Sequence, residues 1–363
     1  MSKLHELYGQ GQSVWIDFIK RSFLTSGELK NWLDKGARGV TSNPTIFNKA
    51  ITGSDDYDVD LALLARQNKS VEQVYEALVL DDIARAADIE YSLWQSSEAG
   101  DGFVSIEVSP LLAHDTTGTI AEARRLYAAL GHPNVMIKVP ATPAGIPAIE
   151  TLISDGININ VTLIFGREQY RQTAEAYIAG LEKRLAAHGD ITRLASVASV
   201  FVSRLDNLAD PILGTLGAHE LQGTLALANA KLTYVDFQQL FAGDRWERLA
   251  QRGARVQRPL WASTGTKNPS YPDTLYVDSL VGPHTVNTIP PATLDAVVDH
   301  GKTETSIGEG VPQAQECFER LASLGINMFS WTDQLLQEGV AAFGKSYDSL
   351  LASIQEKCSL LRK

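Results

Sequence analysis

One lysine stands alone in an apolar, strand-like segment, NVMIKVPAT at 134–142. Alternation along a strand places Lys138 on the face opposite Ile137 and Val139, and Pro140 ends the pairing of that strand. Taking an ammonium out of water is costly unless it is paired or neutral. A lysine held in such a site can attack a carbonyl group as a free amine. The alternative is a lysine that extends from the end of the strand into solvent.

Other apolar, strand-like segments carry polar residues near their carboxyl ends. These are Asp17, Asn43, Glu107, Asn160 with Thr162, and Ser199. Asn160 and Thr162 are two positions apart, so they share one face of their strand. Two carboxylates and a lysine that meet in one site supply a nucleophilic amine and its acid–base partners. That set of groups suits carbonyl chemistry through a Schiff base.

Two cations follow the later strand-like segments. Arg204 comes after the segment 195–202, and Lys267 comes after the segment 259–263. In parallel α/β barrels the loops of this region commonly bind phosphate, and arginine offers phosphate two aligned donors. The alternative for Arg204 is an ion pair with Asp206 or with another surface acid.

The elements that must position these residues alternate between strands and helices along the whole chain. The expected strands are Ser13–Ile19, Gly39–Asn43, Phe103–Ser109, Asn134–Val139, Asn158–Phe165, Ala195–Val202, Pro259–Ser263 and His284–Ile289. Eight strands that alternate with helices predict an α/β fold, a (β/α)8 TIM barrel. An open doubly wound sheet is the competing fold, but it requires a glycine-rich phosphate loop after an early strand. The sequence has no such loop.

The chain is longer than a usual barrel, so we expect additional helices on a single domain spanning 1–363. We place them after strand two, after strand six and in a helical C-terminal extension at 311–363. Near Pro211 and Gly217 we expect breaks in the helices that follow strand six. In the C-terminal extension we expect breaks at Gly325, Gly339 and Gly344.

Composition narrows the range of partners. The 363 residues carry a net charge of −11 and are 44% hydrophobic and 21% charged, as in an ordinary globular protein. Such a charge disfavours nucleic acid, so an anionic substrate needs a local cationic site. The N-terminus lacks a signal-peptide core, and no apolar segment reaches membrane-spanning length. Cys317 and Cys358 are far apart, which favours a reducing cytoplasm over a disulfide framework.

No metal or cofactor is expected. The seven histidines are scattered without metal-ligand spacing. The segment Gly301–Thr303 resembles the end of a phosphate-binding loop, but the required first glycine is Ala296 and a helix precedes it.

Four motifs resemble those of the transaldolases, the Schiff-base enzymes of the pentose phosphate pathway. The motifs are GVTSNPTIF (39–47), NVMIKVPAT (134–142), NINVTLIF (158–165) and ASVFVSRLD (198–206). The resemblance covers essentially the whole chain. The length and the segment WASTGTKNP (261–269) look like the longer bacterial subfamily.

The resemblance implies a role for each residue. Lys138 forms the imine, Asp17 acts at the hydroxyl whose deprotonation breaks the C3–C4 bond, and Glu107 and Thr162 activate water. The dihydroxyacetone unit is held by Asn43, Asn160 and Ser199. The sugar phosphate is bound by Arg204. Family members have a serine and an arginine after strand seven, where this chain offers Ser263 and Lys267.

Three functions remain open on the sequence alone. The first is transfer of a dihydroxyacetone unit from sedoheptulose 7-phosphate to glyceraldehyde 3-phosphate, giving erythrose 4-phosphate and fructose 6-phosphate. The second is a fructose 6-phosphate aldolase, but those relatives are shorter and carry glutamine at the position of Glu107. The third is a non-catalytic sugar-phosphate-binding barrel, which would not need Lys138 and both acids. The sequence leaves open whether the protein is a monomer or a homodimer.

Overall fold

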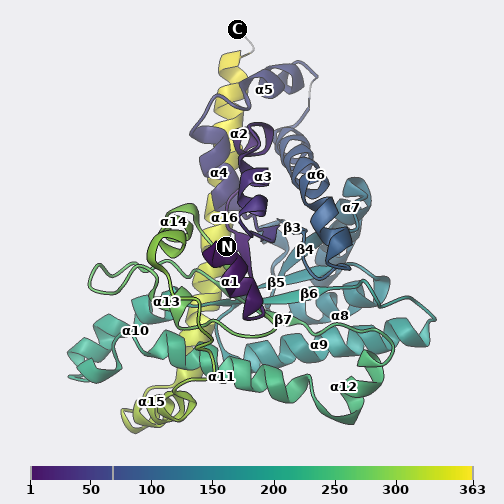
Figure 1. Ribbon diagram of the computed structural model, residues 1–363. Helices are drawn as coiled ribbons and strands as arrows, with labels where there is room; N and C mark the ends of the chain where they lie inside the picture. Colours follow the sequence, from purple (N-terminus) through teal and green to yellow (C-terminus); the bar gives the residue numbers. More distant parts are fainter. Residues whose placement is uncertain (1, 68, 362–363) are drawn as a thin grey trace.

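The computed structural model describes residues 2–67 and 69–361, and the eight strands in this part of the chain close into a parallel barrel in chain order (Figure 1). The strands are β1 (Gln12–Ile16), β2 (Gly39–Val40), β3 (Phe103–Glu107), β4 (Val135–Pro140), β5 (Ile159–Ile164), β6 (Ser196–Phe201), β7 (Arg258–Ala262) and β8 (Thr285–Ile289). The barrel closes because β8 pairs in parallel with β1. The predicted (β/α)8 barrel is confirmed.

Helices follow the strands and surround the barrel (Figure 1). They are α1 (Lys3–Gly9), α2 (Arg21–Thr25), α3 (Glu28–Asp34), α4 (Pro44–Thr52), α5 (Asp58–Ala65), α6 (Val71–Ser96), α7 (Thr116–Leu130), α8 (Gly145–Asp155), α9 (Arg167–Ala186), α10 (Ser203–Thr215), α11 (Leu225–Leu240), α12 (Gly243–Ala250), α13 (Leu275–Asp278), α14 (Pro291–His300), α15 (Val311–Ser323) and α16 (Met328–Leu361), with short 3-10 turns η1 (Pro110–Leu112) and η2 (His219–Leu221). The predicted extra helices and the C-terminal helical extension are therefore present.

Three expected helix breaks are wrong. The helix α16 continues through Gly339 and Gly344, and α10 continues through Pro211. A Cβ at Gly339 would lie 2.9 Å from the side chain of Leu163 and 3.6 Å from Arg204 Nη1, so this glycine allows the helix to approach the barrel closely. In α10 the buried apolar face compensates for the single backbone hydrogen bond that proline removes.

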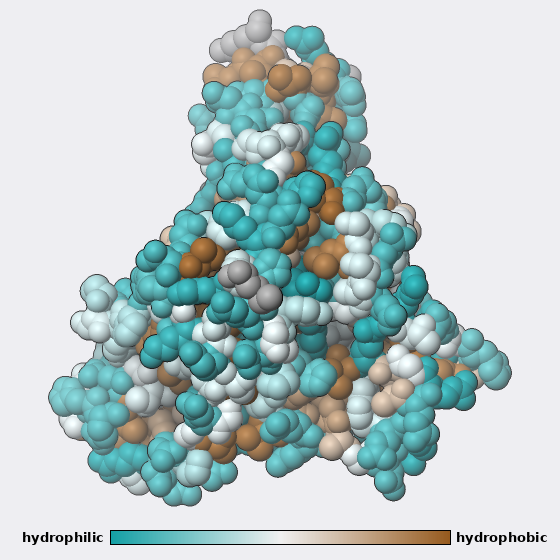
Figure 2. Space-filling model, in the orientation of Figure 1, coloured by the Kyte–Doolittle hydropathy of each residue, from teal (hydrophilic) through white to brown (hydrophobic). Residues whose placement is uncertain are grey.

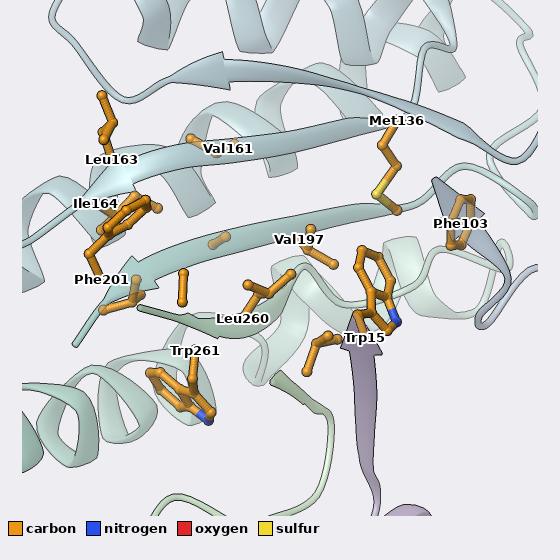
Figure 3. Close-up of a cluster of buried hydrophobic side chains, with 14 of the residues drawn as sticks. Trp15, Phe103, Met136, Val161, Leu163, Ile164, Val197, Phe201, Leu260 and Trp261 are labelled. Atoms are coloured by element: carbon orange, nitrogen blue, oxygen red, sulfur yellow. The ribbon is translucent and has the colours of Figure 1, made fainter. Parts of the chain in front are cut away.

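Apolar side chains fill the barrel on the N-terminal side of the site residues. Trp15, Phe103, Met136, Val197 and Leu260 are fully buried and lie close together there (Figure 3). They come from different strands, as in the interior layers of a packed barrel. Apolar side chains therefore fill the barrel between the site residues and the N-terminal ends of the strands.

The N-terminal end of the barrel is closed by an ion-pair cluster around Asp101. Its carboxylate accepts hydrogen bonds from Ser13 at 2.9 Å, from Arg38 at 2.6 Å and from Arg258 at 3.0 Å. These partners come from β1, from the segment before β2 and from β7, so one buried carboxylate links three parts of the barrel.

The long helix α16 runs along much of the molecule beside the barrel (Figure 1). It contacts α4 and α5, and it also contacts β5 and α10 at the barrel mouth. The surface shown in Figure 2 is mostly hydrophilic. Val59 and Leu63 of α5 and Leu360 of α16 are exposed apolar side chains. Figure 1 places α5 beside the C-terminal end of α16. In the described part of the chain, no helix is both long enough and apolar enough to span a membrane.

Candidate active site

A cavity of about 480 Å³ opens at the C-terminal end of the barrel. It is lined by all the predicted site residues except Glu107 and Asn160, namely Asp17, Asn43, Lys138, Thr162, Ser199, Arg204, Ser263 and Lys267. Glu107 and Asn160 lie on either side of Lys138 in the strand register, and both side chains are buried. The structure thus brings the predicted residues together in one site. We call the space that they enclose the substrate cavity.

Lys138 is buried at the centre of this site. Its side chain is 6% exposed, which excludes the solvent-extended alternative. The Nζ atom donates a hydrogen bond to the carbonyl of Ser42 at 3.0 Å and lies 3.6 Å from Glu107 Oε2. The second distance is too long for a hydrogen bond but short enough for a strong charge interaction in a buried site. Lys138 is therefore held by fixed partners while it faces the cavity.

The carboxyl group of Glu107 is poised near neutral pH. Burial raises its pKa to about 7, although the charge of Lys138 opposes that rise. Among the residues that the structure describes, neither the buried Oε2 atom nor Thr162 Oγ1 has a hydrogen-bond partner. Glu107 and Thr162 belong to the two strands that flank the lysine strand. Two unpartnered buried oxygens beside an amine suit the binding of one water molecule.

Asp17 follows β1 directly on another side of the cavity. Its carboxylate accepts a hydrogen bond from Thr41 Oγ1 at 2.7 Å, and Thr41 in turn lies 2.5 Å from Thr288 Oγ1. Burial raises the pKa of Asp17, and the charge of Lys138 and the Thr41 hydroxyl oppose this. The two threonines fix the orientation of the carboxylate, so Asp17 can exchange a proton with a ligand at a defined position.

A chain of hydrogen bonds orients the amide of Asn160. The hydroxyl of Ser199 donates to Asn160 Oδ1 at 2.7 Å, and Asn160 Nδ2 donates to Ser105 Oγ at 3.0 Å. All three side chains are at least 97% buried. Asn43 has a second task, because its Oδ1 caps α4 by accepting the Ile46 N–H at 2.9 Å. Its amide nitrogen is then left to donate to a ligand.

Arg204 supplies a cation at the outer part of the cavity. In the described residues its guanidinium takes part in no ion pair, and it lies 4.9 Å from the ring centroid of Phe201. The alternative partner Asp206 instead accepts hydrogen bonds from the Ala226 N–H and the Tyr276 hydroxyl, both at 2.8 Å. Burial lowers the pKa of Arg204, and the negative charge of Glu338 opposes this. An arginine without a close counterion, facing a cavity, is suited to bind an anion.

The segment after β7 completes the wall beside Arg204. Ser263 has φ of 57°, a left-handed conformation that is strained for a serine. Its hydroxyl lies 3.0 Å from Ser203 Oγ. Lys267 is exposed at the rim of the cavity. The two candidates after strand seven therefore face the same cavity as Arg204.

Several residues of the site were not identified from the sequence. Ser105 alternates with Glu107 in β3 and contacts Asn160, and Thr288 of β8 lines the cavity. Strand alternation could have revealed both of them. No local signal indicated Phe343, which α16 brings to the cavity from the far end of the chain. In the residues that the structure describes, no group of three or more potential ligands is placed to hold a metal.

The fold and this site define a class of protein, the (β/α)8-barrel enzymes whose chemistry can be centred on a buried lysine. A family model described as Transaldolase/Fructose-6-phosphate aldolase matches residues 14–354. The chain therefore belongs to the transaldolase/fructose-6-phosphate aldolase family, as the resemblance of its motifs predicted.

Full-length relatives agree with this assignment. A transaldolase of Trichodesmium erythraeum is 45% identical over 99% of this chain and 98% of the relative. A transaldolase of Neisseria meningitidis is 46% identical over 98% of this chain and 100% of the relative. A protein named transaldolase 2 from Nostoc punctiforme is 43% identical over 99% and 98%. These matches support an enzyme, and specifically a transaldolase.

Proposed function

We propose that this enzyme moves a dihydroxyacetone unit from sedoheptulose 7-phosphate to glyceraldehyde 3-phosphate through a Schiff base on Lys138. The products are erythrose 4-phosphate and fructose 6-phosphate. The observation that carries the proposal is the buried pair of Lys138 and Glu107, 3.6 Å apart, at the cavity of a barrel mouth. The family implies small sugar-phosphate substrates.

The chemistry begins with attack of Lys138 Nζ on the ketose carbonyl. Glu107 gives a proton to the leaving hydroxyl of the carbinolamine, and the imine and one water molecule form. Thr162 holds that water beside the lysine. Because the pKa of Glu107 is about 7, both forms of the carboxyl group are populated near neutral pH. One residue can therefore serve both formation and hydrolysis of the imine.

Cleavage and transfer then depend on Asp17. Its carboxylate takes the proton of the C4 hydroxyl, the C3–C4 bond breaks, and the electron pair moves into the iminium of Lys138. The aldose product leaves. The three-carbon unit stays on the lysine until an acceptor aldehyde reforms the bond and takes the proton back from Asp17. Asn43, Asn160 and Ser199 hold the hydroxyl groups of the retained unit.

Recognition of phosphate falls to Arg204, with Ser263 and Lys267 as further ligands. Arg204 provides paired donors without a competing ion pair among the described residues. Since the protein has a net charge of −11, this local cation must overcome a repulsive overall field.

We also infer a single barrel domain, since α16 returns from the C-terminal region to pack on α4, α5 and β5. A cytoplasmic location is part of the proposal. It is supported by cysteines placed on the separate helices α15 and α16, and the acidic charge argues against nucleic acid as a partner.

Two assays test the proposal. Borohydride reduction in the presence of fructose 6-phosphate should add one three-carbon unit to a peptide that contains Lys138, and an adduct on another lysine would contradict the assignment. A coupled assay with fructose 6-phosphate, with and without erythrose 4-phosphate, separates transfer from release. Turnover that does not need the acceptor would indicate an aldolase instead.

A further inference from the structure

A second cavity lies behind Glu107, on the side away from the substrate. It has a volume of about 280 Å³ and lies between the end of β3 and the helices α6, α7 and α16. We call it the side cavity. It shares no lining residue with the substrate cavity, yet Glu107 borders it while lying 3.6 Å from Lys138, which borders the substrate cavity. The Lys138–Glu107 pair therefore lies between the two spaces, with one residue bordering each of them.

The lining of the side cavity is strongly acidic. Among the described residues, the charged side chains that line it are four glutamates and one cation, namely Glu72, Glu76, Glu107, Glu122 and Arg125. A phosphorylated sugar would be repelled by such a lining. The side cavity can hold water, because its volume far exceeds that of one water molecule and polar groups are present on several sides. The side cavity is therefore suited to water and not to a second substrate.

Polar groups lead from Glu107 toward the surface. Tyr75 lies near both Glu107 and Glu122, and burial together with nearby negative groups raises the pKa of its hydroxyl. Glu122 is partly buried and accepts the Ser109 N–H at 3.1 Å. At the outer end the more exposed Arg125 forms a two-point ion pair with Glu76, with both distances 2.7 Å. Polar groups thus line the way from the buried carboxyl group to solvent.

Burial limits the contact of Glu107 with solvent on the substrate side. Its Oε2 atom is fully buried 3.6 Å from Lys138 Nζ, and the side chain as a whole is only 5% exposed. That oxygen is the one placed above beside the water of Thr162, so a second, hydrated space next to the carboxyl group would let Glu107 exchange protons with bulk solvent.

We propose that the side cavity holds water that joins Glu107 to bulk solvent from the side opposite the substrate. The proposal rests on the function given above for Lys138 and Glu107. When the imine forms, the C–O bond of the carbinolamine breaks, Glu107 donates its proton to the leaving hydroxyl, and one water is released. Hydrolysis reverses these steps and consumes one water. The bound sugar phosphate occupies the substrate cavity at that time, so in this proposal the side cavity provides the route for this exchange.

Substitutions in the lining of the side cavity can test whether water passes through it. Tyr75 of α6 and Tyr347 of α16 pack edge to face, with ring centroids 5.4 Å apart, and both line the side cavity. Tyr75→Phe removes one hydroxyl from the lining and keeps the ring. Leu126→Phe, on α7, adds bulk to the cavity wall. Neither residue borders the substrate cavity.

The test follows label from heavy-oxygen water into the C2 carbonyl of fructose 6-phosphate, corrected for uncatalysed exchange, with the enzyme and no acceptor. The quantity compared is the amount of label incorporated divided by the amount of imine, which is measured by borohydride trapping on Lys138. This ratio should fall about 2- to 10-fold in Tyr75→Phe, because the loss of one hydrogen bond changes an equilibrium by about that factor. Leu126→Phe should lower it further. Tyr127→Phe is the matched control on α7, since Tyr127 is partly buried but does not line the side cavity, and it should keep the wild-type ratio.

The outcomes separate the two proposals. A wild-type enzyme that neither forms the Lys138 adduct nor incorporates label contradicts the proposed function. An enzyme that does both, with unchanged label per imine in Tyr75→Phe and in a folded Leu126→Phe, overturns the side-cavity proposal alone. If Leu126→Phe does not fold, the result with Tyr75→Phe decides.

Discussion

Replacing Glu107 by glutamine should weaken catalysis and stabilise the fold at the same time. Glutamine has nearly the same shape as a protonated glutamate but cannot give or take the proton. Glu107 lies 3.6 Å from Lys138 with a side chain that is 5% exposed, so the substitution removes a buried, titrating group beside the reacting amine. The loss of one acid–base group typically slows a reaction about 10²–10⁴-fold. We expect transfer to slow by that factor.

The effect on stability follows from the pKa. Burial raises the pKa of Glu107 from 4.5 to about 7 in the folded protein. Between these values the folded state binds more protons than the unfolded state, so stability falls as the pH rises from about 4.5 to 7. The full difference is about 3 kcal/mol above pH 7. Glutamine does not ionise, so Glu107→Gln should escape this loss.

Two measurements check the reasoning. Urea unfolding at about pH 8 and pH 5 should show that the stability gain of Glu107→Gln over wild type is larger at the higher pH. The pH profile of kcat/KM should lose an inflection near 7 that the wild-type enzyme shows. Glu319→Gln, an exposed position on α15, is the matched control and should change neither measurement.

A stability difference between variant and wild type that does not grow with pH would refute the assigned pKa. Unchanged turnover in Glu107→Gln would show that the carboxyl group has only a structural role. Because the two readouts are independent, either part of the reasoning can fail without the other.

Two further substitutions probe the outer part of the cavity. Arg204→Ala should lower kcat/KM for fructose 6-phosphate about 10- to 150-fold, because it removes a charged hydrogen-bond partner, and should barely change kcat/KM for unphosphorylated fructose. Arg204→Lys should recover part of the lost activity. Equal losses on both substrates would contradict phosphate recognition by Arg204. Gly339→Leu should lower the same constant about 5- to 150-fold by overpacking against Leu163 and Arg204. Gly344→Leu, on the same helix with nothing within 4 Å of an added Cβ, should leave it unchanged, and similar losses in both variants would show a general helix effect.

The strands could be predicted because their signal is local. Alternation in the segment around Lys138 placed the lysine on the face opposite Ile137 and Val139, and in the structure that residue borders the substrate cavity. Parallel pairing then fixes the register that brings Glu107 beside it. Polar residues at the strand ends are therefore sufficient to indicate the inner part of the cavity from the sequence alone.

The contribution of α16 to the outer part of the cavity could not be predicted in the same way. Phe343 and Gly339 come from α16, whose position depends on packing between segments far apart in the sequence. Gly339 was expected to break the helix, since glycine is locally unfavourable there. The decisive contact of Gly339 is with Leu163, which lies at a bulge in β5 and has φ of 59°. Neither the bulge nor the contact has a local signature.

This contrast suggests a division of tasks in the enzyme. The groups that we propose to act beside the reacting carbon lie on neighbouring strands of a closed barrel, where backbone pairing limits movement. This favours a fixed arrangement of Lys138, Glu107 and Thr162. The phosphate end is formed by loops and by a C-terminal helix that only packs against the barrel. We therefore expect changes in the strands to act mainly on kcat. Changes in α16, such as at Gly339, should act mainly on KM, because they alter binding of the part of the substrate that does not react.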